Sequence, residues 1–325
     1  MSKNNNIQEP MFTDYLLQKG YSTNTIERYA KDVDKFKLWV KQENQSMESI
    51  RQSDILFYIQ GKKITNSQRS ISVIINSIKH YYNYLIAINI SVENPARQIQ
   101  IKGIKRKVLY HILSKKELEK LYNDFGEIAE KPKTERSPNN KTKKNLFENS
   151  EQVSKRNKVI LGLIIYQGLG TAELSRLTEK DLKLREGKIF ISGTRRSNER
   201  EMKLEAHQIM DIMEYQIKIR KELLAQSNKE SDKLFISTGS SERFSNIIQG
   251  LMKKLRKQRS AEKSVNSKIT SLKQIRSSVI THWLKIHNLR QVQYMAGHRY
   301  VSSTEAYLIN DLDDLSEEVN KYHPI

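Results

Sequence analysis

The pattern of apolar and polar positions predicts helices throughout residues 11–96. Apolar side chains recur there every three or four positions, the spacing of an amphipathic helix. The clearest case begins after Ser22 and carries the stripe Ile26, Tyr29, Val33, Phe36 and Val40. Further helices are predicted over 12–17, 53–60 and 67–88, and Gly20 ends the first of them. We therefore expect an all-α N-terminal domain of about four helices.

From residue 113 onward the pattern mixes helices with a short hairpin. Ser114 and Glu117 have the spacing of a capping box. Residues 159–177 predict a buried helix, 187–191 a strand, 193–199 a polar turn and 200–204 the returning strand. More helices are predicted over 208–225, 244–257, 270–286 and 289–296. The expected fold class is mainly α (α+β), with a small antiparallel hairpin in the second domain.

Three segments lack a periodic pattern. Residues 1–10 are polar, and we expect a disordered end. Residues 97–112 are rich in Lys and Arg and predict a basic linker between the domain at 11–96 and a second domain at 113–325. Residues 130–151 combine two prolines, paired asparagines and several lysines, which predicts a polar insertion loop.

The charge balance points to a polyanionic partner. The chain has 325 residues with 57 Lys and Arg against 37 Asp and Glu, a net charge of +20 and a pI near 9.7. Double-stranded DNA or another nucleic acid is the commonest partner of such a surface, although a basic surface kept for solubility would look the same.

Several classes are excluded. The absence of Cys removes disulfide frameworks, thiolate zinc sites and Cys nucleophiles. No apolar run approaches the length of a membrane span, and the first ten residues lack the apolar stretch of a secretory signal, so we expect an intracellular protein with no membrane contact.

Residues suited to phosphate chemistry gather near the end of the chain. Ala296-Gly297-His298 is followed nine residues later by Tyr307, and Lys273 and Arg276 precede it at i and i+3 on one helix. Two cationic donors can hold a phosphate, a histidine can donate to an oxyanion, and a tyrosine hydroxyl can attack. Each residue alone has an ordinary structural explanation, but this order and spacing together favour a catalytic site.

The arrangement resembles the tyrosine recombinase/integrase family. Residues 296–307 match the family's final Gly-His box with its tyrosine, and 273–276 match the box of His or Lys, two residues, then Arg. Residues 166–177 resemble its Thr-Gly-Leu-Arg-x-x-Glu-Leu box, and 189–200 its lysine-bearing hairpin. Residues 25–29 and 80–96 resemble the ends of its SAM-like core-binding domain, so the likeness covers about 11–323. The hairpin pattern Gly-x-Arg-Arg-Ser-Asn-x-Arg is similar to that of Bacteroidetes-type integrases.

This resemblance implies a site-specific recombinase. Tyr307 would form a 3′-phosphotyrosyl link with DNA, while Arg276, His298 and Lys273 stabilise the transition state and no metal or other cofactor takes part. The family's form implies a C-shaped clamp around double-stranded DNA and a homo-tetramer on paired sites. The expected setting is a mobile element in a bacterial cytoplasm, with the protein on the nucleoid when it is bound to DNA.

Two positions depart from the family pattern. Gly170 stands where the first catalytic arginine is expected, and Arg195 stands at the hairpin lysine. An arginine can hold a phosphate but is a poor general acid, because it stays protonated at neutral pH. We expect the missing charge from Arg195 or Arg196, with Arg200 and Arg176 as further sources.

The departures leave an alternative open, a catalytically weak or inactive DNA-binding relative. A basic RNA- or ribosome-associated protein would explain the charge but not the nine-residue spacing from His298 to Tyr307. The expected DNA contacts lie on helices of the first domain and in the linker, although each of those on a helix could equally belong to a solvated face. They are Arg28, Arg69, Lys79, Lys105, Arg106 and Lys107. Residues 319–324 are expected to pack on a neighbouring protomer or to form a frayed end.

Overall fold

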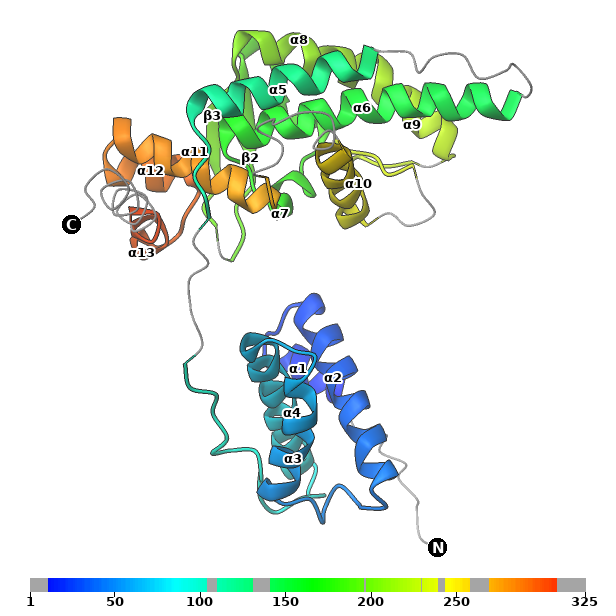
Figure 1. Ribbon diagram of the computed structural model, residues 1–325, viewed down its shortest axis with the longest axis vertical. Helices are drawn as coiled ribbons and strands as arrows, with labels where there is room; N and C mark the ends of the chain where they lie inside the picture. The colour runs from blue at the N-terminus through cyan, green and yellow to red at the C-terminus, as the bar shows by residue number, and fades with distance from the viewer. Residues whose placement is uncertain are drawn as a thin grey trace, which may run out of the picture. The chain divides into compact units, whose positions relative to one another are not determined.

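The computed structural model describes residues 11–103, 110–130, 141–195, 197–228, 230–238, 243–257 and 269–308, and of 126–130, 141–150 and 257 only the backbone. The chain separates into two compact units that divide between residues 108 and 109. Both are helical in their described parts, and the second also holds a three-stranded sheet (Figure 1). The predicted 1–10 terminus, the linker residues 105–107 and the 319–324 tail lie outside the described residues.

The first unit packs four helices around one apolar core within residues 11–103. Their bounds are α1 Phe12–Gln18, α2 Thr23–Gln42, α3 Gln52–Lys63 and α4 Gln68–Ala87. The stripe predicted on α2 faces inward, since Ile26, Val33, Phe36 and Val40 are all buried. Burying apolar area of this kind supplies most of the stability of a helical unit, at about 25 cal/mol per Å².

The predicted linker is packed at both of its ends. Ile99 is buried in the core of the first unit. At the other end the backbone N–H of Leu113 donates to Ser278 Oγ over 2.9 Å, and the side chain of Gln274 donates to the carbonyl of His111 over 2.9 Å. Residues 97–112 therefore contain less free linker than their composition predicts.

The second unit is built around a long central helix, α6 Lys141–Gln167, which packs against α5, α8, α9 and α11. In Figure 1, α5 and α6 run side by side. The other helices are α5 Lys115–Glu130, α7 Thr171–Leu174, α8 Ala206–Glu214, α9 Arg220–Ser227, α10 Phe244–Lys257, α11 Leu272–Ile286, α12 Leu289–Ala296 and α13 Val301–Glu305. Short turns lie at η1 Glu179–Asp181 and η2 Leu184–Glu186, and the π-turn η3 Tyr215–Ile219 joins α8 to α9.

The sheet is antiparallel in the order β1-β2-β3, with β1 Leu182–Lys183, β2 Lys188–Ile191 and β3 Arg200–Lys203. Ile189 pairs with Met202, and Ile191 pairs with Arg200. Side chains alternate between the two faces of a strand, and these four are the buried ones of β2 and β3. One core-facing position of β3 therefore holds an arginine.

The predicted loop over 130–151 is wrong in its second half. The α6 helix begins at Lys141, so the polar residues from there to 151 are helical. These residues lack an apolar stripe. However, extending an existing helix orders only one residue for each hydrogen bond gained, whereas starting a new helix orders several residues for its first hydrogen bond. The buried part of α6 from Val159 onward supplies that existing helix.

The single helix predicted over 159–177 is also wrong, because it breaks after Gln167. Gly168 adopts a left-handed φ of +61°, and α7 starts again at Thr171. The break turns the chain so that Glu173, in the first turn of α7, is buried. Within the described residues, no helix is long and apolar enough to cross a membrane.

We expect the Gly168→Ala substitution to lower the free energy of unfolding by roughly 2–4 kcal/mol. An added Cβ would lie 2.6 Å from Cη2 of Trp283, at a φ that L-residues rarely adopt. The matched control is Gly250→Ala, where no atom lies within 4 Å of the added Cβ and α10 should gain about 0.5–1 kcal/mol. Urea unfolding of both variants measures the difference, and equal stabilities would refute the argument.

Candidate active site

One carboxylate, that of Glu173, joins two arginines from distant parts of the chain. Arg276, on α11, donates from Nη1 to Glu173 Oε2 over 2.6 Å. Arg200, on β3, donates from Nη1 to Glu173 Oε1 over 2.6 Å. The Glu173 side chain is 7% exposed, so these pairs lie in a largely desolvated site. Paired in this way, a buried carboxylate is stable where a lone one would not be.

Local structure holds Glu173 in place. It is the third residue of α7 and accepts a hydrogen bond from the backbone N–H of Gly170 over 2.7 Å. Burial acts to raise the pKa of Glu173, but the hydrogen bond from Arg200 and the charges of Arg276 and Arg200 lower it to about 2. The carboxylate is therefore ionised at every physiological pH.

Arg276 has a second anchor. Its Nη2 donates to the carbonyl of Ala296 over 2.8 Å, which ties α11 to the last residue of α12. Gly297 then takes a left-handed φ of +67° and ends α12. The chain turns there, and His298 follows directly. The helix cap thus positions the histidine beside the arginine.

His298 and Tyr307 lie face to face, with ring centroids 5.7 Å apart and planes 14° from parallel. His298 Nδ1 lies 2.9 Å from Oγ1 of Thr304, whose side chain is fully buried. Burial, followed by the charges of Arg276 and Arg200, lowers the pKa of His298 to about 4. The imidazole is therefore neutral at pH 7, and one of its nitrogens carries a proton that it can donate.

The hydroxyl of Tyr307 meets the same arginine. Burial raises the pKa of Tyr307, whereas the charge of Arg276 and a hydrogen bond from it lower that pKa. The result is a neutral phenol in contact with a guanidinium, half-buried behind the histidine ring. Tyr307, His298 and Arg276, which the sequence motif predicted together, do converge.

The hairpin turn 193–199 lies against this segment. The backbone N–H of Asn198 donates to the carbonyl of Gly297 over 3.0 Å, and Ser197 forms a β-bridge with His298. The guanidinium of Arg299 donates to the carbonyl of Arg195 over 2.9 Å. The sheet and the tyrosine segment are therefore held together at the turn.

The remaining predicted residues lie in different surroundings. Lys273 is exposed, with its Nζ 5.9 Å from the centre of the Tyr110 ring. Arg195 is exposed at the turn, and Arg176 is half-buried after α7. Arg196 lies outside the described residues. Of the two hairpin arginines that the structure describes, Arg195 and Arg200, it is Arg200 that pairs with Glu173.

Sequence reasoning missed Glu173 and Thr304 as site residues. Glu173 stands three positions after Gly170, the spacing of a helix-capping carboxylate, and that signal could have placed it. Nothing in the local pattern around Thr304 distinguishes it from the neighbouring Ser303. Among the described residues, no cluster of three His, Asp or Glu side chains is placed to hold a metal ion.

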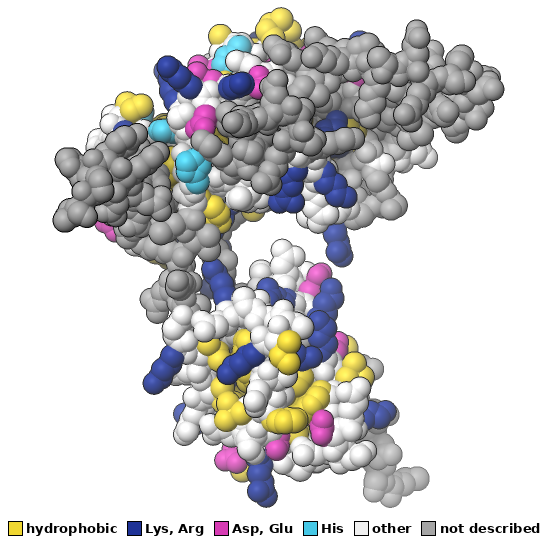
Figure 2. Space-filling model, in the orientation of Figure 1, with side chains coloured by type: hydrophobic (Ala, Val, Ile, Leu, Met, Phe, Trp, Pro, Cys, Tyr) yellow, Lys and Arg dark blue, Asp and Glu magenta, His cyan; other side chains and the backbone are white. Residues whose placement is uncertain are grey.

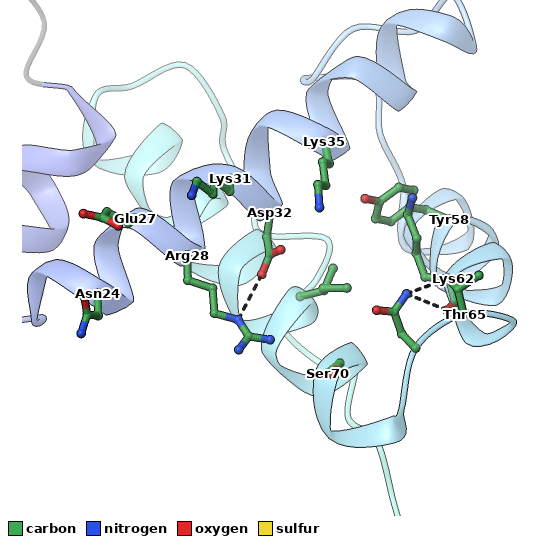
Figure 3. A pocket seen from close by; sticks show the side chains of 12 residues that line it. Asn24, Glu27, Arg28, Lys31, Asp32, Lys35, Tyr58, Lys62, Thr65 and Ser70 are labelled. Atoms are coloured by element: carbon green, nitrogen blue, oxygen red, sulfur yellow. Dashed lines mark hydrogen bonds and ion pairs between the residues drawn. The ribbon is translucent and has the colours of Figure 1, made fainter. Parts of the chain in front are cut away.

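The first unit carries a basic groove of about 610 Å³ between α2, α3 and the start of α4 (Figure 3). Arg28, Lys31 and Lys35 line it from α2, and Lys62 lines it from α3. Figure 3 shows the guanidinium of Arg28 turned toward Asp32, 3.9 Å from its carboxylate. The three α2 cations are spaced i, i+3 and i+7, and so they share one face.

The other predicted DNA contacts of the first unit lie outside that groove. Arg69 is exposed at the start of α4. Lys79 lines a second groove, of about 1010 Å³, together with Arg51 and Arg97. In the view of Figure 2, dark blue Lys and Arg side chains stand out over the visible face of the first unit, with fewer magenta acidic ones among them.

The fold and the site define a protein of the integrase class, and family comparisons agree. Residues 139–312 match the model of the phage integrase family. Residues 11–89 match the model of its N-terminal SAM-like domain. The chain belongs to the phage integrase family. The family and the mainly α fold class predicted from the sequence are both confirmed.

Several curated proteins are similar over almost the whole chain. Tyrosine recombinase XerD of Oceanobacillus iheyensis is 29% identical, over 97% of each chain. Tyrosine recombinase XerD of Shewanella oneidensis is 26% identical, over 96% of this chain and 94% of that protein.

Solved structures share the fold. XerH site-specific recombinase bound to difH in a pre-cleavage complex has a TM-score of 0.62 at 18% identity, over 92% of this chain and 79% of that chain. A lambda integrase tetramer bound to a Holliday junction has a TM-score of 0.60 at 13% identity, over 91% and 74%.

We expect the burial of His298 to make stability depend on pH. The unfolded chain protonates this ring near pH 6.5, whereas the folded chain does so only near pH 4. Stability is therefore fully present above about pH 6.5 and falls as the pH drops toward 4, and this group accounts for about 2 kcal/mol of the loss between pH 7 and pH 5. Urea unfolding at pH 7 and pH 5 should show a smaller loss in His298→Gln than in the wild type. Equal losses in the two proteins would contradict the assignment.

Proposed function

We propose that this protein is a site-specific DNA recombinase that breaks and rejoins DNA through a covalent bond between Tyr307 and a 3′-phosphate. The observation that carries the proposal is the convergence of Tyr307, His298 and Arg276: the imidazole stacks on the phenol ring, the phenol hydrogen-bonds to the guanidinium, and the guanidinium charge acts on the imidazole. Membership of the phage integrase family and the similarity to proteins named tyrosine recombinase support it.

The chemistry needs no external energy source. The Tyr307 oxygen loses its proton and bonds to phosphorus, the bond from phosphorus to the 5′-oxygen breaks, and that oxygen gains a proton. Negative charge on the phosphate oxygens grows in the pentavalent transition state, so fixed donors supply most of the catalysis. Arg276 would bind one such oxygen. The phosphotyrosyl ester keeps the bond energy, and a 5′-hydroxyl reverses the step in rejoining.

His298 would act as a neutral hydrogen-bond donor. Thr304 Oγ1 lies within hydrogen-bonding distance of Nδ1, so a hydroxyl proton donated there leaves the ring proton on Nε2. That nitrogen would then face the phosphate. Because the pKa of His298 lies near 4, this role does not require imidazolium at neutral pH.

The alternative function is DNA binding without cleavage, and Gly170 is the observation that favours it. Glycine offers no side chain at the position of the family's first catalytic arginine, and Arg195, at the hairpin lysine, cannot release a proton. Formation of a covalent protein–DNA adduct decides between the two.

We propose that the DNA is double-stranded, that four protomers act on paired sites and that the setting is a bacterial mobile element. The tetramer rests on the likeness to lambda integrase, which was solved as a tetramer on a Holliday junction. The mobile-element role rests on the hairpin pattern shared with Bacteroidetes-type integrases.

Tyr307→Phe should abolish the covalent adduct and leave DNA affinity unchanged, because phenylalanine keeps the ring but has no attacking oxygen. The probe is a nicked suicide duplex built on the sequence that the wild-type protein selects from randomised DNA. Tyr300→Phe is the matched control, since Tyr300 is 66% exposed in the same segment. An adduct of undiminished yield in Tyr307→Phe would sink the proposal, as would none with the wild type.

The α2 groove should contribute to DNA affinity through charge. Lys31→Gln with Lys35→Gln should weaken binding and reduce the slope of log affinity against log salt by up to about 1.8, since each phosphate contact contributes about 0.9. Lys37→Gln with Lys41→Gln makes the same change of charge on a different face of α2, at residues that do not line the groove. Slopes measured over a range of salt should differ between the two pairs. Identical slopes would mean that the groove does not touch DNA.

A further inference from the structure

Arg200 is a buried cation whose hydrogen-bonding capacity is only partly used. Its side chain is 0% exposed, and its Nη1 bonds to Glu173. Within the described residues, its Nε and Nη2 atoms are buried and have no hydrogen-bonding partner. These two nitrogens form one edge of the planar guanidinium, with two parallel N–H donors.

Such an edge has a defined chemical preference. Buried donors left unpaired cost free energy, and native proteins rarely tolerate them without a function. Two parallel N–H donors match a pair of oxygens on a carboxylate or a phosphate. Since Glu173 already occupies the third nitrogen, the free edge of Arg200 suits a second anion.

The position of Arg200 ties this edge to the reacting groups. Its guanidinium lies so close to Gly297 that an added Cβ would fall 2.8 Å from Cζ. His298 follows directly and senses the charge of Arg200. Through Glu173 the same guanidinium is joined to Arg276, whose Nη1 lies 3.0 Å from where a Cβ at Gly170 would stand.

We propose that Arg200 supplies the cation that Gly170 lacks, with its Nε–Nη2 edge binding two non-bridging oxygens of the phosphate that Tyr307 attacks. Nη1 stays on Glu173 throughout. This inference rests on the proposed function and deepens it by naming a catalytic residue at that site. Because the edge is buried in the DNA-free chain, contact with the phosphate requires the packing around the guanidinium to open.

The pairing with Glu173 has a second effect. Glu173 carries a full negative charge between two guanidinium groups. Arg200 offsets that charge, which leaves the positive charge of Arg276 available to the phosphate. Without Arg200, the carboxylate would neutralise Arg276 instead.

The first experiment measures single-turnover adduct formation on the nicked suicide duplex at saturating protein. Arg200→Ala should slow it by about 10²–10³, the effect of removing one fixed donor to a transition-state oxyanion. Arg200→Lys should stay slow, because lysine keeps the charge but not the two-donor edge. Arg220→Ala is the control: Arg220 is equally buried in the same unit and pairs with Glu179. Its rate per folded molecule should match the wild type.

A second experiment separates contact with the phosphate from a structural role. A methylphosphonate at the scissile position removes the negative charge that Arg200 would bind. On that substrate the deficit of Arg200→Ala relative to the wild type should shrink to less than about tenfold, since the missing donor then costs little. A merely structural defect would persist at full size on both substrates, and that result would overturn the inference.

A rescue variant makes the test independent of folding losses. Gly170 has an ordinary φ of −84°, and the atoms nearest an added Cβ are the ends of Arg276 and Glu173. Gly170→Arg should therefore restore adduct formation by at least about tenfold in the Arg200→Ala background, by returning a cation to the site. No gain would overturn the inference.

The outcomes also distinguish this inference from the function on which it rests. A wild-type protein that forms no adduct refutes both. A wild-type adduct, together with an Arg200→Ala rate equal to it, refutes the assignment of Arg200 alone.

Discussion

The site in the second unit depends on the ion pairs that the carboxylate of Glu173 forms with Arg200 and Arg276. These pairs join α7, β3 and α11, which are distant in sequence. Arg200 follows Glu173 by 27 residues, and Arg276 follows Arg200 by 76. Two cations and one anion at 2.6 Å form a compact group with one net positive charge. A buried carboxylate is stable only while its partners remain, and losing one partner of such a group typically costs about 3–5 kcal/mol. The same ion pairs therefore hold the three elements together and set the charge of the site.

Much of the fold could be predicted because it follows from repeated local patterns. The apolar stripe on α2 and the bounds of α12 follow from spacing alone. The helix from Lys141 could not be predicted in this way, since the sequence of its first turns has no periodic apolar stripe. The break at Gly168 escaped prediction because a left-handed glycine and the Trp283 ring that fills the adjacent space are distant in sequence.

The site residues likewise divide into those that a local sequence pattern predicts and those that it does not. Motif spacing grouped Arg276, His298 and Tyr307, and they lie close together because one continuous stretch from α11 to just beyond α13 carries all three. Lys273 shares a helix with Arg276, yet spacing of three residues cannot say which of the two faces solvent. The alternation of the strand in the sequence indicates that Arg200 is buried. Positions 200, 202 and 204 share one face, and Met202 and Leu204 show that this face is the core.

An arginine at that core position is an exception to apolar alternation, and such exceptions tend to mark functional sites. Electrostatic stabilisation depends on where a donor lies, not on which segment of the chain supplies it. A cation on β3 differs from one at residue 170, the N-cap of α7, because its backbone belongs to the hairpin whose turn bonds to Gly297. Because Nη1 of Arg200 is held by Glu173, a displacement of that turn moves Gly297 and His298 relative to the cation. Placing the charge on the hairpin therefore couples the geometry of the phosphate site to the position of the turn, a coupling that an arginine at residue 170 would not create.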